Sequence, residues 1–443
     1  MFYHIITIGC QMNKADSERI AAFLEERSYQ PLSEWLGADL VVLTTCGVRQ
    51  SAEDRVYGLV NQIRKNNPGA VVVITGCLAR RADVQKRLRG QVDLFLPINE
   101  LPNLFALLKD CQQKLQLSSE EVRELSGEKY LTIAPKYQSN FTAYLPIGNG
   151  CNNFCSYCVV PYARGREVYR PAAKILAEAR ALLKRGYKEI ILIAQNVNSY
   201  HSADTNFPKL LARLAALPGN FWLRFSSSHP KDLSDELIAV LASSDKICHH
   251  LHVAVQSGDD EILQAMNRKY TAAHFRSLIQ KIRLAKPGIA ITTDVIVGFP
   301  GETKKQFNNS VKLFKDLNFD MAYTAQYSPR PGTVSWQMKD DVPREEKRRR
   351  EQILTEILRK SGQKANKAYL HKEVQVLVEG KNKKNKYYGK SSSFKTILFK
   401  ANQELRPEEI IGSFVTVKIN KIQDFGLEGV LIQSSLSAGA HSK

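Results

Sequence analysis

Three cysteines in the segment "GNGCNNFCSYCVVPY" (148–162) are the residues with the clearest potential for chemistry. Cys151, Cys155 and Cys158 follow the spacing C-x3-C-x2-C. A structural zinc site usually has four ligands in two separated pairs, whereas the next cysteine here, Cys248, is far along the chain. Thiolates also bind iron–sulfur clusters, and three ligands on a four-iron cluster leave one iron open to a small molecule. The spacing therefore favours an iron–sulfur cluster over zinc.

A second set of three cysteines closes three similar apolar runs near the N-terminus. "HIITIGC" ends at Cys10, "DLVVLTTC" at Cys46 and "AVVVITGC" at Cys77. Short, β-branched, nearly continuous apolar runs are typical of parallel strands buried on both faces, and a polar helical pattern follows each of these. Open parallel sheets bind ligands at the carboxyl ends of their strands. The sequence therefore predicts a second three-cysteine group at the functional edge of a sheet.

The strands and helices that the sequence predicts around these cysteines indicate an α/β protein of several domains. Six strand–helix units in the middle of the chain are too few for a closed eight-stranded barrel, so we expect an open, partial (β/α)6 barrel with its site at the strand ends. After a basic helix the apolar period changes to two, which is typical of a small antiparallel β-barrel. The predicted parts, in order, are a parallel α/β domain (1–114), a linker (115–136), the partial barrel (137–370), the antiparallel β-barrel (371–435) and a disordered tail (436–443).

The charge of the chain points to a polyanionic partner. The 443 residues carry a net charge of +19, and "KNKKNKYYGK" (381–390) holds five lysines and two tyrosines but no acid; solubility alone is the alternative. The N-terminal apolar run is too short for a signal peptide, and no stretch approaches the roughly 18 apolar residues of a membrane span. We therefore expect a cytoplasmic protein with no membrane partner, in which clustered thiols bind metal rather than pair as disulfides.

Several longer motifs are similar to those of one family. They are "GCQMNKADSE", "TTCGVR", "GCLARR", "GCNNFCSYCVVPYARGREVYRP", "QNVNSY", "HVAVQSGDDEILQAMNRKYT", "DVIVGFPGE" and "YSPRPGT". With them the chain resembles the methylthiotransferase family of radical S-adenosylmethionine (SAM) enzymes, from residue 9 to about 433. The resemblance implies an N-terminal cluster domain, a radical SAM core and a C-terminal, OB-like TRAM domain. "GCQMN", "QNVNSY" and "MNRKYT" most resemble the MiaB type, which adds a methylthio group to isopentenylated adenosine beside the anticodon of tRNA.

The resemblance implies two [4Fe-4S] clusters and SAM as cofactors. Cys151, Cys155 and Cys158 would hold the cluster that generates a radical from SAM, and Cys10, Cys46 and Cys77 the cluster that presents the sulfur group. An adenine C–H bond offers no acid–base route at neutral pH, which is why a radical is needed. Residues expected near SAM, with strand-end capping as the alternative, are Tyr157, Gln195, Asn196, Ser227, Gln256, Ser257, Arg268, Asp294 and Gly298. Tyr157 would flank the adenine, Arg268 would pair with the carboxylate, and Gly298 would permit close backbone approach.

The TRAM-like barrel would hold the anticodon stem-loop of tRNA by its backbone. Candidate RNA-binding residues are Lys383, Lys384, Lys386, Tyr387 and Tyr388. Residues interpreted as structural are Phe394 (barrel core), Arg348–Arg350 (a solvated helix face), Cys111 and Cys248 (small apolar side chains), and His249, His250 and His252 (sheet and loop residues with no carboxylate partner in sequence).

Other functions remain open at this stage. The same chemistry on threonylcarbamoyl-adenosine of tRNA or on a ribosomal protein is one alternative. A non-enzymatic RNA-binding protein with a structural metal is another. The enzyme hypotheses imply tRNA, an external electron donor and a sulfur donor as partners.

Overall fold

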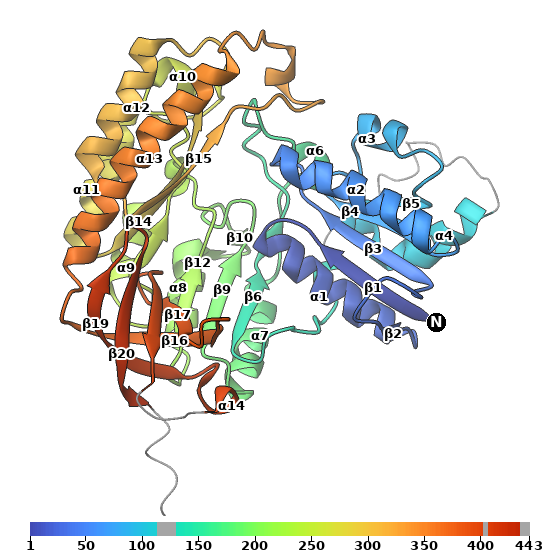
Figure 1. Ribbon diagram of the computed structural model, residues 1–443, viewed down its shortest axis with the longest axis horizontal. Helices are drawn as coiled ribbons and strands as arrows, with labels where there is room; N and C mark the ends of the chain where they lie inside the picture. Colours follow the sequence, from blue (N-terminus) through green and yellow to red (C-terminus); the bar gives the residue numbers. More distant parts are fainter. Residues whose placement is uncertain (113–129, 402–405, 435–443) are drawn as a thin grey trace, which may run out of the picture.

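The computed structural model describes residues 1–112, 130–401 and 406–434 (Figure 1). Most of the predicted linker (115–136), the predicted tail (436–443) and the side chain of Cys111 lie outside the described residues. No helix in the described part is long and apolar enough to cross a membrane.

The N-terminal domain is a five-stranded parallel sheet covered by helices, as the apolar runs predict. The strand order is β2-β1-β3-β4-β5, and the short edge strand β2 is an addition to the prediction. All residues of β3 are buried, because valine and leucine line both of its faces. The elements are β1 (Phe2–Thr7), α1 (Gln11–Glu25), β2 (Gln30–Pro31), β3 (Leu40–Thr45), α2 (Gln50–Asn66), β4 (Val71–Gly76), α3 (Ala82–Arg87), β5 (Leu94–Leu96), the 3-10 helix η1 (Ile98–Asn103) and α4 (Leu104–Gln112).

The central domain is the predicted open barrel, built from two three-stranded parallel sheets, β12-β9-β6 and β13-β14-β15. Single bridges such as Leu223 to Ile247 connect them, and α11, α12 and α13 cover the outside (Figure 1). The strands are β6 (Thr142–Pro146), β9 (Glu189–Ile193), β12 (Trp222–Phe225), β13 (His250–His252), β14 (Ala290–Val297) and β15 (Met321–Gln326). The main helices are α6 (Val160–Arg164), α7 (Ala172–Lys184), α8 (Phe207–Ala215), α9 (Asp235–Ala242), α10 (Asp260–Ala265), α11 (Ala272–Ala285), α12 (Lys304–Leu317) and α13 (Arg344–Lys367).

The C-terminal domain is a closed barrel of β16 (Glu373–Lys381), β17 (Tyr387–Ser391), β18 (Thr396–Lys400), β20 (Gly426–Ser434) and β19 (Phe414–Ile422), in that spatial order. Its β18 and β20 pair in parallel, which corrects the prediction of a wholly antiparallel barrel. This parallel pair joins the third and fifth strands of the domain, so turn signals between neighbouring runs could not reveal its direction.

Helix α1 belongs to two hydrophobic cores. Ile20 and Phe23 pack in the core of its own sheet. Met12 and Ala15 instead pack against Ile191 and Ile193 of β9 in the barrel domain. The helix therefore joins the two domains, and Cys10, its N-cap residue, lies where they meet.

Glu18 of α1 makes the stability of this junction depend on pH. Burial raises the pKa of Glu18 to about 7; one carboxylate oxygen accepts a 3.0 Å hydrogen bond from the Gln138 backbone N–H, and the other has no partner. Because the folded protein binds the Glu18 proton more tightly than the unfolded chain does, the protonated side chain adds to the free energy of unfolding. This contribution is complete below about pH 4.5 and is lost as pH rises through about 7. Since an amide cannot ionise, Glu18→Gln should increase the free energy of unfolding by roughly 1–3 kcal/mol near pH 8 and by clearly less near pH 5. Denaturant titrations at both pH values measure this, and an equal effect at the two would contradict it.

Candidate active site

The three cysteines of the central domain, Cys151, Cys155 and Cys158 (the barrel triad), lie on a loop that is fixed by hydrogen bonds. Cys151 N donates to Gly165 O at 3.1 Å, and Cys158 N donates to Cys155 O at 3.0 Å. Gly150 has a φ of +87°, and a Cβ there would lie 2.0 Å from the Arg166 carbonyl oxygen, so only glycine fits before the first cysteine. Asn267 supports the middle of the loop, because its side-chain amide donates to the Phe154 carbonyl at 2.9 Å.

The three cysteines of the N-terminal domain (the N-terminal triad) lie together because each follows the end of a parallel strand. Cys46 follows β3, Cys77 follows β4, and Cys10 follows β1 at the start of α1. A Cβ on Gly9 would lie 2.7 Å from the Cys46 Cβ, and one on Gly47 would lie 3.2 Å from the Cys77 Cβ. Glycines beside two of the cysteines thus let the three strand ends converge.

The two triads adjoin each other. A Cβ on Gly47 would lie 3.1 Å from the side chain of Val159, which directly follows Cys158. Burial, then Cys155, and to a smaller extent Cys77, raise the pKa of Cys158; burial and then Cys77 raise the pKa of Cys46. Buried thiols that disfavour one another's ionisation suit a positively charged partner such as iron. Within the described chain no three Cys, His, Asp or Glu side chains converge on a single-ion site, but a cluster does not need this, because each cysteine binds a different iron.

A buried ion pair connects the triads. Arg164 ends α6, just after the barrel loop, and its Nη2 donates to Asp16 Oδ2 at 2.7 Å and to Asn13 Oδ1 at 2.9 Å, both on α1. Its Nη1 donates to Asn149 Oδ1 at 3.0 Å, and the Tyr130 hydroxyl donates to Asp16. The Arg164 and Asp16 side chains are only 2% and 1% exposed. Although burial opposes the charge, Asp16 and then Cys77 hold the pKa of Arg164 above its usual value.

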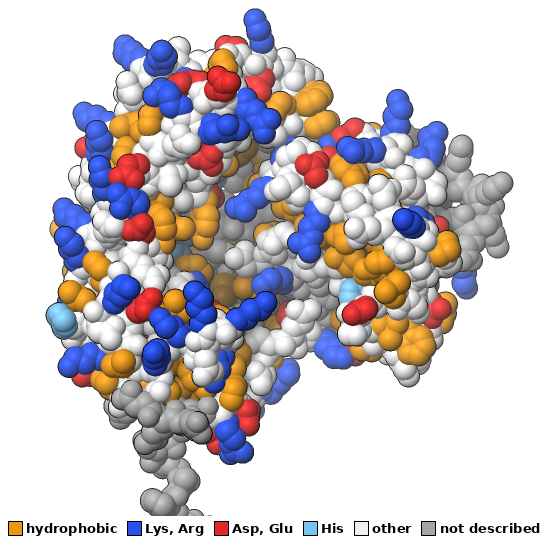
Figure 2. All heavy atoms as spheres, in the orientation of Figure 1, with side chains coloured by type: hydrophobic (Ala, Val, Ile, Leu, Met, Phe, Trp, Pro, Cys, Tyr) orange, Lys and Arg blue, Asp and Glu red, His pale blue; other side chains and the backbone are white. Residues whose placement is uncertain are grey.

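A cavity of 840 Å³ opens between the three domains (Figure 2). Lys and Arg side chains surround the hollow in this view. Its lining includes Cys10, Cys46, Arg49 and Arg55 from the N-terminal domain, Tyr144, Glu189, Arg224, Ser226, Ser227, His250, His252, Asp294 and Tyr323 from the barrel, and Glu379, Lys390 and Phe394 from the C-terminal domain.

Polar side chains without partners gather where β9 and β12 end. Gln195 Oε1, Asn196 Oδ1 and Ser228 Oγ are buried and make no hydrogen bond, and neither polar atom of Asn198 does. Asn196 Nδ2 donates to Asp232 Oδ2 at 2.6 Å, which orients that amide. Buried polar groups without partners carry a large desolvation cost, so this group suits a polar ligand. The strand ends in the sequence point to Gln195 and Asn196, but not to Asn198, which lies two residues further along the same loop.

Ser227 and Gln256 adopt left-handed backbone conformations, with φ of 67° and 70°. Gln256 N donates to Asp294 O at 2.8 Å, and Ile296 N donates to Gln256 O at 3.0 Å, so the segment after β13 is bridged to β14. Ser257 is fully buried, and its hydroxyl accepts from the Asp259 backbone N–H at 3.2 Å. Non-glycine residues in this region of φ often occur at ligand sites.

Arg268 and Tyr157 lie beside the barrel triad. Arg268 Nη1 donates to Cys155 Sγ at 3.5 Å and its Nε donates to the Tyr270 hydroxyl at 2.8 Å. Burial raises the pKa of Tyr157, and its ring packs on the apolar cluster of Met266, Phe299 and Tyr327. The Arg268 guanidinium therefore already has Cys155, Tyr270 and the Ala254 carbonyl as partners in this structure.

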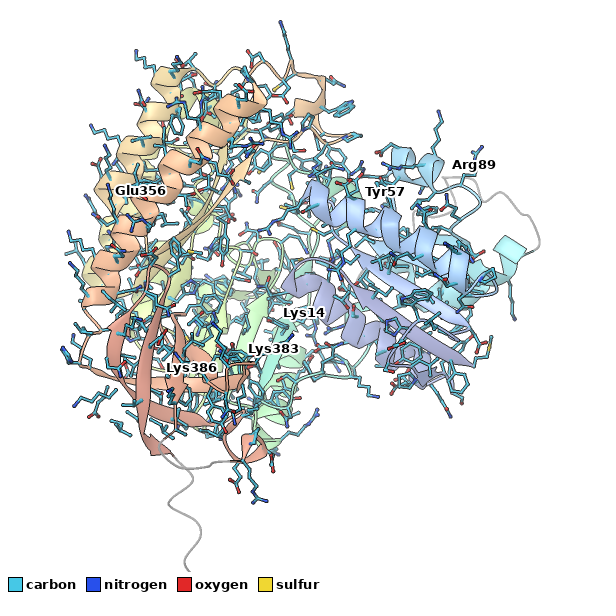
Figure 3. The ribbon with its side chains drawn as sticks, in the orientation of Figure 1. Lys14, Tyr57, Arg89, Glu356, Lys383 and Lys386 are labelled. Atoms are coloured by element: carbon cyan, nitrogen blue, oxygen red, sulfur yellow. The ribbon has the colours of Figure 1, made fainter. Side chains whose placement is uncertain are left out.

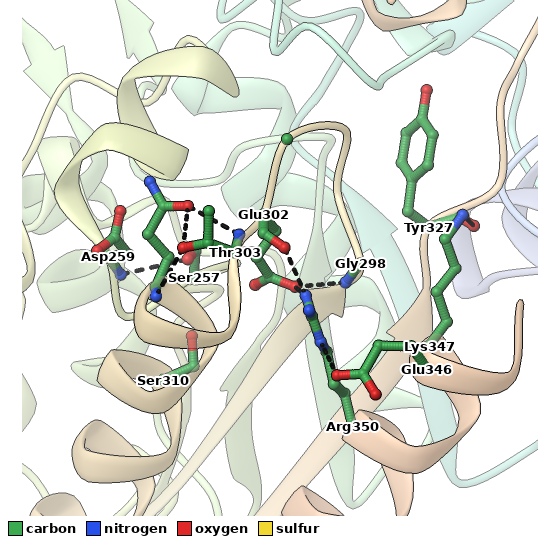
Figure 4. Close-up of polar contacts among 12 residues, drawn as sticks. Ser257, Asp259, Gly298, Glu302, Thr303, Ser310, Tyr327, Glu346, Lys347 and Arg350 are labelled. Carbon is green, nitrogen blue, oxygen red and sulfur yellow. Dashed lines mark hydrogen bonds and ion pairs between the residues drawn. The ribbon is translucent and has the colours of Figure 1, made fainter. Parts of the chain in front are cut away.

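Gly298 lies close to Lys347 of α13 and hydrogen bonds to Glu302 (Figure 4). A Cβ there would lie 2.3 Å from Lys347 Cγ of α13, so the close approach is made by this lysine. Gly298 N donates to Glu302 Oε2 at 2.6 Å, and Arg350 Nη1 donates to the same oxygen at 2.6 Å. The interpretation of Arg348–Arg350 as a solvated face is wrong for Arg350, whose side chain is 3% exposed.

Two histidines of β13 have polar partners that the sequence did not reveal. His252 Nε2 lies 3.1 Å from Asp294 Oδ2. His250 Nε2 lies 2.9 Å from Thr292 Oγ1, and its ring stacks on Phe394 at a centroid distance of 4.8 Å. These partners come from β14 and from the C-terminal barrel, about 40 or more residues further along the chain.

The candidate RNA-binding residues divide into surface and core. Lys383 and Lys384 are exposed, Tyr388 is half-buried, and Lys386 pairs with Glu428 at 2.9 Å. Tyr387 is 3% exposed and stacks on Phe399 in the barrel core, which corrects its prediction as a base-stacking residue. Phe394 shows the reverse, since it lies outside that core and lines the cavity.

Comparison with known families assigns each domain. Residues 145–314 match the Radical SAM superfamily, residues 2–96 match the family described as "Uncharacterized protein family UPF0004", and residues 367–432 match the TRAM domain. Among solved structures, TsrM from Kitasatospora setae, a radical S-adenosylmethionine methyltransferase, has a TM-score of 0.55 at 17% identity. The match covers 75% of this chain and 74% of TsrM, and it shows the fold alone.

Relatives resemble the chain over almost its whole length. A protein of Carboxydothermus hydrogenoformans is 40% identical over 441 residues, which cover 97% of this chain and 99% of the relative. One of Acetivibrio thermocellus is 38% identical, covering 97% and 91%. Both are named tRNA-2-methylthio-N(6)-dimethylallyladenosine synthase. With two cysteine triads at one domain junction and all three domains matched, the chain belongs to the methylthiotransferase family of radical SAM enzymes.

Proposed function

We propose that this protein is a radical SAM tRNA methylthiotransferase, which converts N(6)-dimethylallyladenosine next to the anticodon to its 2-methylthio derivative. The observation that carries the proposal is the full-length similarity to relatives with that name. The adjoining triads support it, as does the cavity that Cys10 and Cys46 line, because sulfur insertion requires two reactive centres around one substrate atom.

The cofactors that fit are SAM and two [4Fe-4S] clusters, one on each triad. When bound, they supply a carbon-centred radical and a transferable sulfur group, for which the side chains of the protein have no substitute. Cys151, Cys155 and Cys158 would hold the barrel cluster and leave one iron for SAM. The unpartnered Gln195, Asn196, Asn198 and Ser228 would receive polar atoms of SAM, since their own hydrogen-bonding capacity is unused.

The residues of the chain orient the substrate and exclude water. The cavity of 840 Å³ lies within the range of sites that enclose a small organic group, so a single base can enter it. Lys383 and Lys384 of the TRAM domain are exposed for contacts with RNA phosphates. The reaction further implies an external electron donor and a sulfur donor, and a tRNA substrate supports the expectation of a cytoplasmic protein.

Methylthiolation of a defined RNA tests the function. Protein reconstituted without oxygen should convert an anticodon stem-loop carrying dimethylallyladenosine into its 2-methylthio form, measured by mass spectrometry of the digested RNA. Cys155→Ala should abolish both SAM cleavage and product, because it removes a ligand of the barrel triad. Stem-loops with unmodified adenosine or threonylcarbamoyladenosine are the matched substrates. Product on the latter alone would reassign the substrate, and product on none would refute the proposed activity.

A further inference from the structure

The N-terminal domain presents two arginines to the cavity. Arg49, the N-cap residue of α2, and Arg55, in the second turn of α2, both line it and both are exposed. In the described part of the chain no ion pair joins either guanidinium to a carboxylate, whereas Arg224, which also lines the cavity, pairs with Glu189, and Lys390 donates a hydrogen bond to Thr396. Two free guanidinium groups beside a substrate cavity suit an anionic ligand.

An aromatic side chain faces these arginines from the barrel. Tyr323 of β15 lines the same cavity and is 45% exposed, an unusual state for a large ring. Burial and then Asp294 raise the pKa of Tyr323, and Arg49 opposes that rise, which places Arg49 within electrostatic reach of the hydroxyl. Exposed aromatic rings interleaved with free cations are typical of single-stranded nucleic-acid binding, in which bases stack and phosphates pair.

We propose that Arg49, Arg55 and Tyr323 form a second RNA-binding surface, which holds the strand that flanks the target adenosine. The inference rests on the proposed function. Arg49 and Arg55 contact phosphates beside the target nucleotide, and Tyr323 stacks on a neighbouring base. The stem-loop then contacts both the TRAM lysines and the N-terminal domain. The N-terminal domain therefore contributes to substrate binding in addition to carrying its three cysteines.

Binding measurements on charge-reversal variants test this surface. Arg55→Glu should weaken binding of the dimethylallyladenosine stem-loop to the reconstituted protein by roughly tenfold, and lower the slope of log K against log salt by about 0.7–0.9. Arg49→Glu should act similarly, and Tyr323→Ala should weaken binding about tenfold or more. Fluorescence anisotropy across a salt series provides these values. The matched control is Arg89→Glu, an exposed cation on the N-terminal domain that lies away from Lys14 and Lys383 (Figure 3).

The possible outcomes decide the proposal. Wild-type affinity and salt slope in the Arg49 and Arg55 variants would overturn it, as would an equal loss in Arg89→Glu, since binding would then follow net charge alone. Arg55→Gln, with iron content and circular dichroism as checks, keeps the test valid if charge reversal impairs folding. Because binding is measured without turnover, a failure of methylthiolation would leave this result interpretable.

Discussion

Replacing Cys46 and Cys77 with alanine is expected to abolish methylthio transfer while leaving SAM cleavage within about threefold of wild type. The two side chains belong to the N-terminal triad, so the barrel loop keeps its three cysteines and its hydrogen bonds. Iron content should fall from about eight to about four atoms per chain, because one of the two proposed four-iron clusters would lose ligands. Iron analysis, 5′-deoxyadenosine release and RNA mass spectrometry measure the three quantities.

Cys248→Ala is the matched control for these variants. Cys248 is buried among Trp222, Leu377 and Phe414, so its loss removes a thiol without removing a cluster ligand. It should leave iron content and turnover unchanged. Full methylthiolation by the Cys46/Cys77 variant would show that the N-terminal triad is not required and would refute the two-cluster assignment.

Replacing Arg164 with methionine should uncouple the two triads. The change leaves Asp16 buried with only the Tyr130 hydroxyl as a donor, and removing one partner of a buried pair typically costs about 3–5 kcal/mol. Since a shift of reacting groups by about 1 Å can cost about 100-fold in rate, product per SAM cleaved should fall at least tenfold. The ratio of methylthiolated RNA to 5′-deoxyadenosine measures the coupling directly.

A surface ion pair at the same junction provides the comparison. Lys136 pairs with Glu25 of α1 at 2.6 Å, but its side chain is 54% exposed. Lys136→Met should change stability by less than about 1 kcal/mol and leave the product ratio unaltered. If Asp16→Asn and Arg164→Met act on one interaction, the double variant should lose less than the sum of the two singles. An unchanged product ratio in a folded, iron-replete Arg164→Met variant would rule out the positioning role.

The sequence was sufficient for most of the architecture because continuous β-branched runs mark buried parallel strands. β3 and β4 each end within a residue of the predicted cysteine, so the N-terminal triad could be placed on one sheet edge. Alternation was a poorer guide to side-chain roles in the small barrel. Tyr387 and Phe394 are both aromatic residues near lysines, yet the first points into the barrel and the second towards the cavity. Phe394 lies in the turn between β17 and β18, outside both strands, so alternation gives no information about its direction.

Contacts between distant segments were beyond sequence reasoning. Arg164 and Asp16 are 148 positions apart, and each alone looks like an ordinary helix residue. Arg350 looked like part of a charged surface run until Glu302, 48 positions earlier, buried it. In both cases a carboxylate from another element offsets the desolvation cost of burying the guanidinium. Such a pairing cannot be predicted from one sequence.

The double membership of α1 determines how RNA can reach the buried chemistry. Swinging the N-terminal domain outward would strip Met12 and Ala15 from Ile191 and Ile193 and expose the Arg164–Asp16 pair to solvent. The contact between the two domains is therefore rigid, and a hinge motion that separates them is not expected. The adenosine must instead unstack from the anticodon loop and enter through the existing opening of the cavity. The conformational change on binding is therefore expected in the RNA rather than in the protein.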